Sequence, residues 1–166
     1  FVGVRGQMTN TTLGPPPRAA SMTEDPARRR VNGGGRVRFV YQLLPATQPE
    51  IVSNSSGPSI FHADFSPVTA GRPARAGEIV IVRATGLGPT RPGVNPGQPF
   101  PADSAQEVNS PVEVLVGGRA AEVVNKVGWP GLTDTYRVDF RVPDGTPAGL
   151  ATLRLSAAWV AGPELQ

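Results

Sequence analysis

Short apolar runs that end at glycine recur along this chain and constrain its fold more than any other feature. The run Glu78–Thr85 leads into Gly86-Leu87-Gly88-Pro89-Thr90, and the run Val112–Val116 ends at Gly117-Gly118. Glycine ends strands in this way because it readily adopts the positive φ angles of tight turns. No stretch keeps the apolar spacing of an amphipathic helix for more than two turns. The pattern therefore predicts an all-β protein made of antiparallel strands.

Alternation of apolar and charged residues is clearest between residues 135 and 142. Every second position there is apolar: Tyr136, Val138, Phe140 and Val142. Three charged residues occupy the positions between them: Arg137, Asp139 and Arg141. One face inward and one outward is what a strand of a β-sandwich requires. The same reasoning predicts further strands at residues 2–8, 37–43, 78–85, 112–116, 120–124 and 151–157.

The amino-acid composition argues against disulfides, thiolate metal sites and membrane helices. The 166 residues contain 20 glycines and 19 prolines but no cysteine, so disulfides and thiolate metal sites are excluded. The glycines and prolines punctuate apolar runs, which indicates many turns within a folded protein. No run approaches the roughly 20 apolar residues of a membrane helix, so membrane insertion is not expected.

Charge and composition suggest three segments. Residues 1–45 contain seven arginines and two acidic residues, whereas residues 46–166 contain nine basic and eleven acidic residues. The first segment, 1–45, is predicted to be a pair of strands joined by a long basic loop that starts near Asn10. Residues 46–66 form a connector with a first sandwich strand, and residues 67–166 form the main domain.

The basic loop contains Arg28, Arg29 and Arg30, followed by glycines 33–35. Such a cluster either binds an anionic group of a partner or is a solvated loop, and both interpretations remain open. Nucleic acid is not an expected ligand, because the loop has no aromatic residue on which a base could stack.

Several ordered motifs of residues 67–166 carry a family resemblance. They are Ala76-Gly77-Glu78, Ala84-Thr85-Gly86-Leu87-Gly88-Pro89-Thr90, Val116-Gly117-Gly118-Arg119-Ala120-Ala121, Gly128-Trp129-Pro130-Gly131, Tyr136-Arg137-Val138 and Val142-Pro143-Asp144-Gly145-Thr146-Pro147-Ala148-Gly149. This segment resembles the bacterial C-terminal sandwich domain of large secreted proteins, especially from soil acidobacteria, which is similar to IPT/TIG domains. The resemblance implies an immunoglobulin-like antiparallel β-sandwich, here with an N-terminal two-strand appendage. It also implies an extracellular or cell-surface location, and it brings no catalytic residues or cofactor.

The end of the chain departs from that family. Members usually continue with a full strand after a turn, which Gly162-Pro163 would form here, whereas this sequence ends at Gln166. A shortened last strand would leave backbone groups of the sheet unpaired. We therefore expect a strand of this chain or of a second copy to complete the sheet. The candidates for this exchange are Val2, Val4, Met8 and Leu165.

Enzymatic chemistry has little support in the sequence. His62 is the single histidine, and it lies two residues from Asp64, with which we expect it to form a structural hydrogen bond. A zinc site needs several histidine or cysteine ligands. Neither a calcium loop nor a phosphate-binding loop is present. The sequence thus predicts a protein that is not an enzyme and carries no metal.

Three aromatic residues are the candidate binding residues. Phe100 lies within residues 86–111, a connection predicted to lack strands, and it either anchors a partner or caps the edge of the sandwich. Trp129 and Trp159 offer flat rings that suit sugar stacking, although packing in the protein is the alternative for each.

Three functions follow from these observations. The first is a non-catalytic surface module for adhesion, scaffolding or protein–protein interaction. The second is a subunit that self-assembles into an oligomer or filament by strand exchange. The third is a carbohydrate-binding accessory domain. The expected partners are accordingly another protein, copies of this chain, or a glycan.

Overall fold

The computed structural model describes residues 5–13, 25, 27, 36–44, 48–95 and 97–166. The chain divides into two compact units, Val4–Pro45 and a larger unit that includes Ala46–Gln166. All regular secondary structure among the described residues is β-strand, and every pairing between strands is antiparallel. The predicted all-β class is therefore confirmed.

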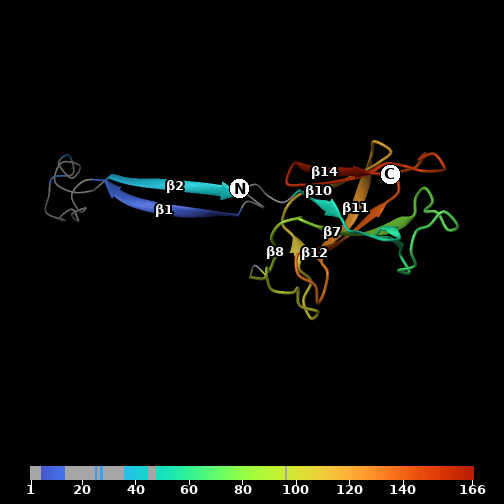
Figure 1. Ribbon diagram of the computed structural model, residues 1–166, viewed down its shortest axis with the longest axis horizontal. Helices are drawn as coiled ribbons and strands as arrows, with labels where there is room; N and C mark the ends of the chain where they lie inside the picture. The colour runs from blue at the N-terminus through green and yellow to red at the C-terminus, as the bar shows by residue number, and fades with distance from the viewer. Residues whose placement is uncertain (1–4, 14–24, 26, 28–35, 45–47, 96) are drawn as a thin grey trace. The chain divides into compact units, whose positions relative to one another are not determined.

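The smaller unit contains a ribbon of two strands, β1 (Arg5–Leu13) and β2 (Arg36–Leu44), drawn in blue and cyan in Figure 1. Its register pairs Met8 with Tyr41. The predicted two-strand appendage is present, but β1 continues past Asn10, where the sequence pattern predicts a loop. Thr11, Thr12 and Leu13 extend the strand, and threonine is a residue type that favours extended backbone.

The larger unit is built from short and medium strands. They are β3 (Glu50–Ile51), β4 (Ser53–Asn54), β5 (Gly57–Pro58), β6 (Ile60–His62), β7 (Ile79–Thr85), β8 (Thr90–Arg91), β9 (Glu107–Val108), β10 (Val112–Val116), β11 (Arg119–Gly128), β12 (Thr135–Arg141), β13 (Leu153–Ala157) and β14 (Val160–Leu165). Ten of them form one sheet, whose main path runs β14-β13-β10-β11-β12-β7-β3.

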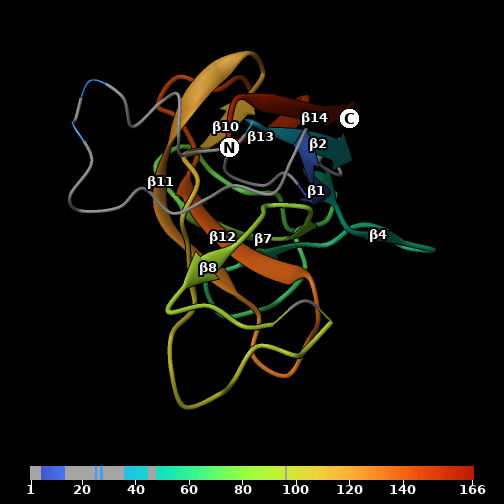
Figure 2. The same ribbon diagram turned by 90° about the vertical axis from the view of Figure 1, so that its left-hand side faces the viewer.

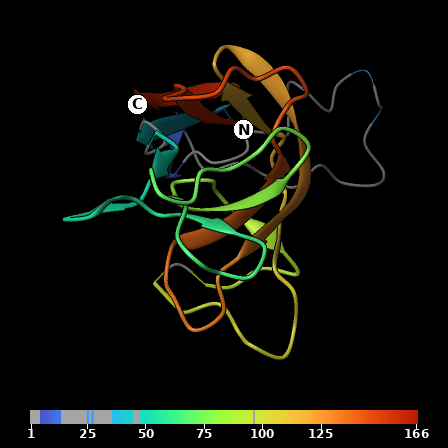
Figure 3. The same ribbon diagram turned by 90° about the vertical axis from the view of Figure 1, so that its right-hand side faces the viewer.

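Strand β11 connects the two sides of this sheet. β10, β13 and β14 lie together on one side of the unit, and β7 and β12 lie on the other (Figure 2). The first residues of β11 pair with β10, where Arg119 faces Val116. Its later residues pair with β12, where Gly128 faces Tyr136. The register shifts between Val123 and Asn125, and such a bulge bends a strand. Figure 3 shows the resulting curl from the opposite side.

The curled sheet is a nearly closed barrel, so the prediction of a clear two-layer sandwich needs correction. The sequence places separate strands on two faces, but it does not reveal that β11 belongs to both groups. Alternation within each strand is the same in a sandwich and in a barrel, because both have one inward face per strand.

The edge of β7 opposite β12 is covered by two short strands. β3 pairs with the end of β7, where Ile51 faces Ala84, and β6 pairs with its beginning, where His62 faces Val80. Between them, the backbone N–H of Val52 donates to the Arg83 carbonyl, and the Arg83 N–H donates to the Ser59 carbonyl. β3 and β6 therefore act as one strand that is interrupted by the small β4–β5 hairpin.

The barrel closes where β14 approaches the segment before β3. A Cβ atom on Gly162 would overlap the carbonyl oxygen of the buried Pro49, so this position requires glycine. Gly162 and Pro163 lie inside β14, and the predicted turn at these residues is wrong. β14 reaches Leu165, which pairs with Leu153 at the start of β13, so β14 covers the whole length of β13.

The core confirms the alternation on which the fold prediction depends. Val138 and Phe140 are buried, and so are the inward residues of the facing strands. The principal members of this core are Val80, Val82, Ala84, Leu87, Val114, Val116, Tyr136, Val138, Phe140, Leu153 and Leu155.

The connection between β7 and β10 also differs from the prediction. It contains β8 and β9, which pair with each other, although this stretch is predicted to lack strands. Phe100 in this connection is buried in the core, where its ring lies 5.2 Å from that of Tyr136 and covers Gly128. Its side chain therefore packs inside the protein and is not available to a partner in this conformation.

Substitution of Gly162 tests the closure of the barrel. We expect Gly162→Ala to lower the free energy of unfolding by about 3 kcal/mol, because backbone atoms on both sides of the position leave no room for a methyl group. Gly71→Ala is the matched control, since the nearest atom to its Cβ is 4.0 Å away. Denaturant unfolding measures both. Equal stability of the two variants would contradict the close approach of β14 to Pro49.

Candidate functional site

His62 has both ring nitrogens occupied. Its side chain is buried, with Nδ1 facing a carboxylate oxygen of Glu78 and Nε2 lying 3.2 Å from the Arg72 carbonyl oxygen. Both ring nitrogens are therefore contacted by groups of the loop that follows β6. The predicted hydrogen bond with Asp64 is wrong, because Glu78, just before the neighbouring strand β7, contacts the ring, while Asp64 contacts Ser66 and Arg72. His62 therefore holds the loop between β6 and β7 through both of its ring nitrogens.

Glu78 completes this arrangement. Its second carboxylate oxygen accepts a hydrogen bond of 2.9 Å from the Arg75 backbone N–H. The hydrogen bond from His62 lowers the pKa of Glu78 below its ordinary value of 4.5, and the Arg75 N–H acts in the same direction against the effect of burial. The Glu78 carboxylate thus connects the beginning of the β6–β7 loop, at His62, with the end of the loop, at Arg75.

Asp64 organises the exposed side of the same loop. It accepts hydrogen bonds from the Ser66 hydroxyl and the Ser66 backbone N–H, and it pairs with Arg72 at 3.0 Å. These contacts hold the pKa of Asp64 well below its usual range. The carboxylate is fully occupied by local contacts, which is the arrangement of a structural turn.

In the part of the chain that the structure describes, no three histidine, aspartate or glutamate side chains gather as metal ligands would. None of the described segments forms a helix long and apolar enough to cross a membrane.

The outer face of β7 and β12 carries a cluster of arginine and aromatic side chains, which we call the arginine–aromatic cluster: Phe65, Arg83, Trp129, Arg137 and Asp139. The Arg83 guanidinium lies over the Trp129 ring, 5.6 Å from its centroid. The Arg137 guanidinium lies 5.1 Å from the Phe65 centroid. The rings of Phe65 and Trp129 meet edge to face at 6.3 Å. Each cation therefore rests on an aromatic ring.

Strand register creates this cluster. Arg83 on β7 lies directly opposite Arg137 on β12, on the face away from the core. Two like charges in that position destabilise a sheet unless they are compensated. Asp139 compensates Arg137 through two hydrogen bonds, of 2.7 and 2.8 Å. Arg83 has the Trp129 ring, but no carboxylate pairs with it among the described residues.

Trp129 is poorly placed for the predicted stacking of a sugar. Arg83 occupies one face of its ring and the edge-to-face contact with Phe65 occupies another side. The two rings are inclined by 73°, so together they do not form a flat platform. Packing within the cluster, the alternative open for Trp129, is the arrangement found.

Trp159 has a different environment. It lies in the turn between β13 and β14, and 84% of its surface is exposed. Its φ angle is +64°, and that of Ala158 is +49°. Among the described residues, no ring contact joins Trp159 to Trp129 or to Phe65, so Trp159 is not a member of the arginine–aromatic cluster.

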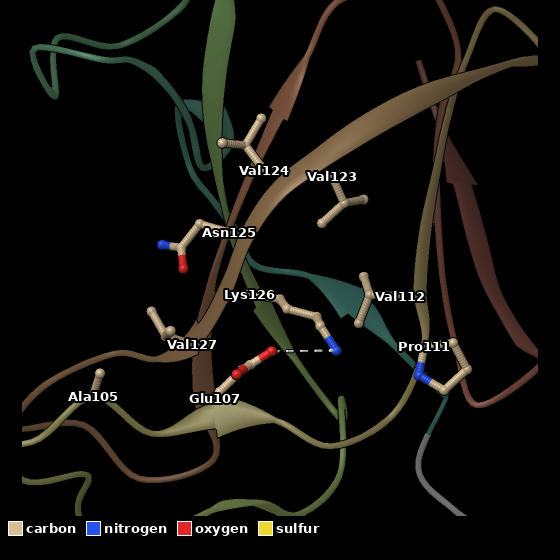
Figure 4. A pocket seen from close by; sticks show the side chains of 9 residues that line it. All are labelled: Ala105, Glu107, Pro111, Val112, Val123, Val124, Asn125, Lys126 and Val127. Atoms are coloured by element: carbon tan, nitrogen blue, oxygen red, sulfur yellow. Dashed lines mark ion pairs between the residues drawn. The ribbon is translucent and has the colours of Figure 1, made fainter.

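A groove of about 630 Å³ lies where β10 and β11 part (Figure 4). The Lys126 side chain extends from β11 toward Pro111 and Val112, and its ammonium group faces the Glu107 carboxylate at 4.0 Å. Its ammonium group donates to the carbonyl oxygens of Val108 and Ser110, at 2.7 and 2.9 Å. These hydrogen bonds connect β11 to β9 and to the segment before β10, so Lys126 has a structural role in the groove.

Some of the predicted binding and strand-exchange residues lie outside the described residues, and others lie in strands. Arg28, Arg29, Arg30, Val2 and Val4 are not among the described residues. Met8 lies in β1, and Leu165 lies in β14 opposite Leu153, partly buried against the core. The role of Val2, Val4, Met8 and Leu165 in strand exchange stays a prediction, and so does the binding of an anionic group by the three arginines.

The arginine–aromatic cluster was not visible in the sequence. Alternation places Arg137 on the outward face of its strand, but no local pattern shows that Arg83 lies opposite it. Phe65 comes from a turn far along the chain from Trp129. Only the register of β7 against β12 and the path of the loop after β6 bring these residues together.

Comparison with known proteins gave no match to a family model, a curated protein or a solved structure. The function is therefore inferred from the residues and geometry described above.

The His62–Glu78 contact predicts a specific dependence of stability on pH. Because the pKa of Glu78 is lowered by folding, its ionised form stabilises the protein above pH 4.5, and this contribution is lost as the pH falls through the lowered value. We expect Glu78→Gln to lower the free energy of unfolding at pH 7 by about 1.5 kcal/mol. The variant should also lose less stability than the wild type on acidification.

Glu113→Gln, which changes an exposed carboxylate on β10, is the matched control. Urea unfolding between pH 7 and pH 3 distinguishes the variants. Identical curves for Glu78→Gln and Glu113→Gln would contradict the role of Glu78 in holding the loop.

Proposed function

We propose that this chain is a non-catalytic surface module that binds a partner protein. The observation that carries the proposal is the exposed Trp159 in its turn. Two-residue hairpin turns with positive φ at both positions favour Asn-Gly, Asp-Gly or Gly-Gly. Here the two positions hold alanine and tryptophan.

Trp159 contributes to stability less than its size suggests. A side chain in the left-handed region costs about 1 kcal/mol relative to ordinary backbone. The exposed fraction of 84% means that little packing offsets this cost. A bulky residue kept in a strained and exposed position points to contact with another molecule.

A protein is the partner that best fits this tip. Tryptophan is enriched among the residues that dominate protein–protein binding energy. The neighbours of Trp159 in the hairpin are Ala158, Val160 and Ala161, so the tip has no basic residue that would attract an anionic lipid surface. The free ring also permits stacking on a sugar, which makes glycan binding the second candidate.

The finer fold relationship belongs to the same proposal. In the strand order of the sheet, β11 lies between two groups of strands. One group is β3-β7-β12 and the other is β10-β13-β14. An immunoglobulin-like sandwich related to IPT/TIG domains would have such groups as its two sheets. This relationship, with the extracellular or cell-surface location that it implies, supports a binding role.

Substitution of Trp159 tests the proposal. We expect Trp159→Gly to raise the free energy of unfolding by about 1 kcal/mol, because glycine adopts the left-handed conformation without strain. Ala158→Gly is the matched control, since it relieves strain in the same turn but keeps the tryptophan. Denaturant unfolding measures both changes.

The binding of a partner protein is compared between the wild type, Trp159→Gly and Ala158→Gly. Each is immobilised and exposed to a surface extract of the source cells, and the retained proteins are quantified by mass spectrometry. We expect a protein that the wild type and Ala158→Gly retain and that Trp159→Gly does not. Equal retention by all three, or binding of a glycan array that depends on Trp159, would contradict a protein partner at this tip.

A further inference from the structure

Phe65, like Trp159, is an exposed aromatic residue with a positive φ angle. Its φ angle is +62°, and half of its surface is exposed. It closes the turn after β6, where the Phe65 N–H donates to the His62 carbonyl and the His62 N–H donates to the Ser66 carbonyl. The left-handed position of such a turn favours glycine. A second aromatic ring is thus held at the surface by strained backbone, and it belongs to the arginine–aromatic cluster.

The cluster has an unbalanced positive charge. It contains two guanidinium groups, and one carboxylate, Asp139, is bound to Arg137. The Nε atom of Arg83 is buried and has no hydrogen-bond partner. A partly desolvated guanidinium without a counter-ion is unfavourable, and a carboxylate that binds the terminal nitrogens of Arg83 would supply the missing negative charge, although the buried Nε itself is not open to it.

We propose that the arginine–aromatic cluster is a second binding site, which takes a carboxylate of an acidic segment in a partner protein. Arg83 binds the carboxylate, and the exposed part of the Phe65 ring contacts the aliphatic part of the same segment. This inference rests on the proposed function, because it assigns the chemistry of a protein partner.

A protein carboxylate fits the geometry better than an acidic sugar does. Sugar binding uses a flat aromatic face, whereas the Trp129 ring is covered by Arg83 and the Phe65 ring is inclined to it by 73°. Arginine and aromatic residues together are the composition of the central part of protein interfaces.

The test uses the full chain and peptides of defined charge. Hexaglutamate is the probe, hexaglutamine is the neutral peptide, and an oligogalacturonate of six units is the acidic sugar. Binding is followed by NMR at the Trp129 indole N–H. We expect saturable shifts with hexaglutamate that weaken as salt is raised, and no saturable shifts with hexaglutamine.

Variants locate the site. Arg83→Gln should weaken hexaglutamate binding about tenfold or more. Arg141→Gln is the matched control, because it removes the same charge from the outer face of β12, where Arg141 pairs with Glu122. It should change the affinity less than twofold. Thermal melting verifies that each variant is folded.

Three results would overturn the inference. They are unchanged affinity in Arg83→Gln, an equal loss in Arg141→Gln, and tighter binding of the oligogalacturonate than of hexaglutamate. Trp159→Gly separates this site from the proposed function, since it should leave the hexaglutamate titration unchanged while it abolishes retention of the partner. Failure at one site is therefore distinguishable from failure at the other.

Discussion

The structure depends on one strand, β11, that pairs with both sides of the larger unit. Its first residues extend the group of β10, β13 and β14, and its later residues extend the group of β12 and β7. The bulge near Val124 supplies the bend that brings the inward faces of both groups around one core. On the far side, β14 approaches Pro49 closely enough to require glycine at position 162. The bend and this close approach together give a barrel in place of two separate layers.

This closure determines which side chains lie in the core. The core is filled with aliphatic and aromatic side chains, and among the described residues no three histidine, aspartate or glutamate side chains gather as metal ligands would. His62 itself is bound on both ring nitrogens by the loop that it holds. The residues that we propose to bind a partner lie on turns and on the outward faces of strands. The two exposed aromatic residues in left-handed backbone, Phe65 and Trp159, lie on two such turns.

The sequence predicts local structure well and long-range arrangement less well. The strand Val112–Val116 and the two faces of β12 follow directly from alternation, because a side-chain period of two is visible in the residues themselves. The length of β11 was missed, since Lys126 interrupts its apolar pattern while its ammonium group connects backbone carbonyls. Gly162-Pro163 has the composition of a turn, yet its glycine is required by Pro49, far away in the sequence. Arg83, Phe65 and Trp129 form a cluster through strand register, which no local pattern encodes.

The central claim is that strained backbone holds aromatic side chains in water so that they can meet a partner. Acrylamide quenching of Trp159 fluorescence tests it most directly, in a Trp129→Phe variant where Trp159 is the one remaining tryptophan. The account predicts strong quenching and long-wavelength emission in the isolated chain, and protection with a shift to shorter wavelength when the partner binds. A weakly quenched, short-wavelength Trp159 in the isolated chain would contradict it.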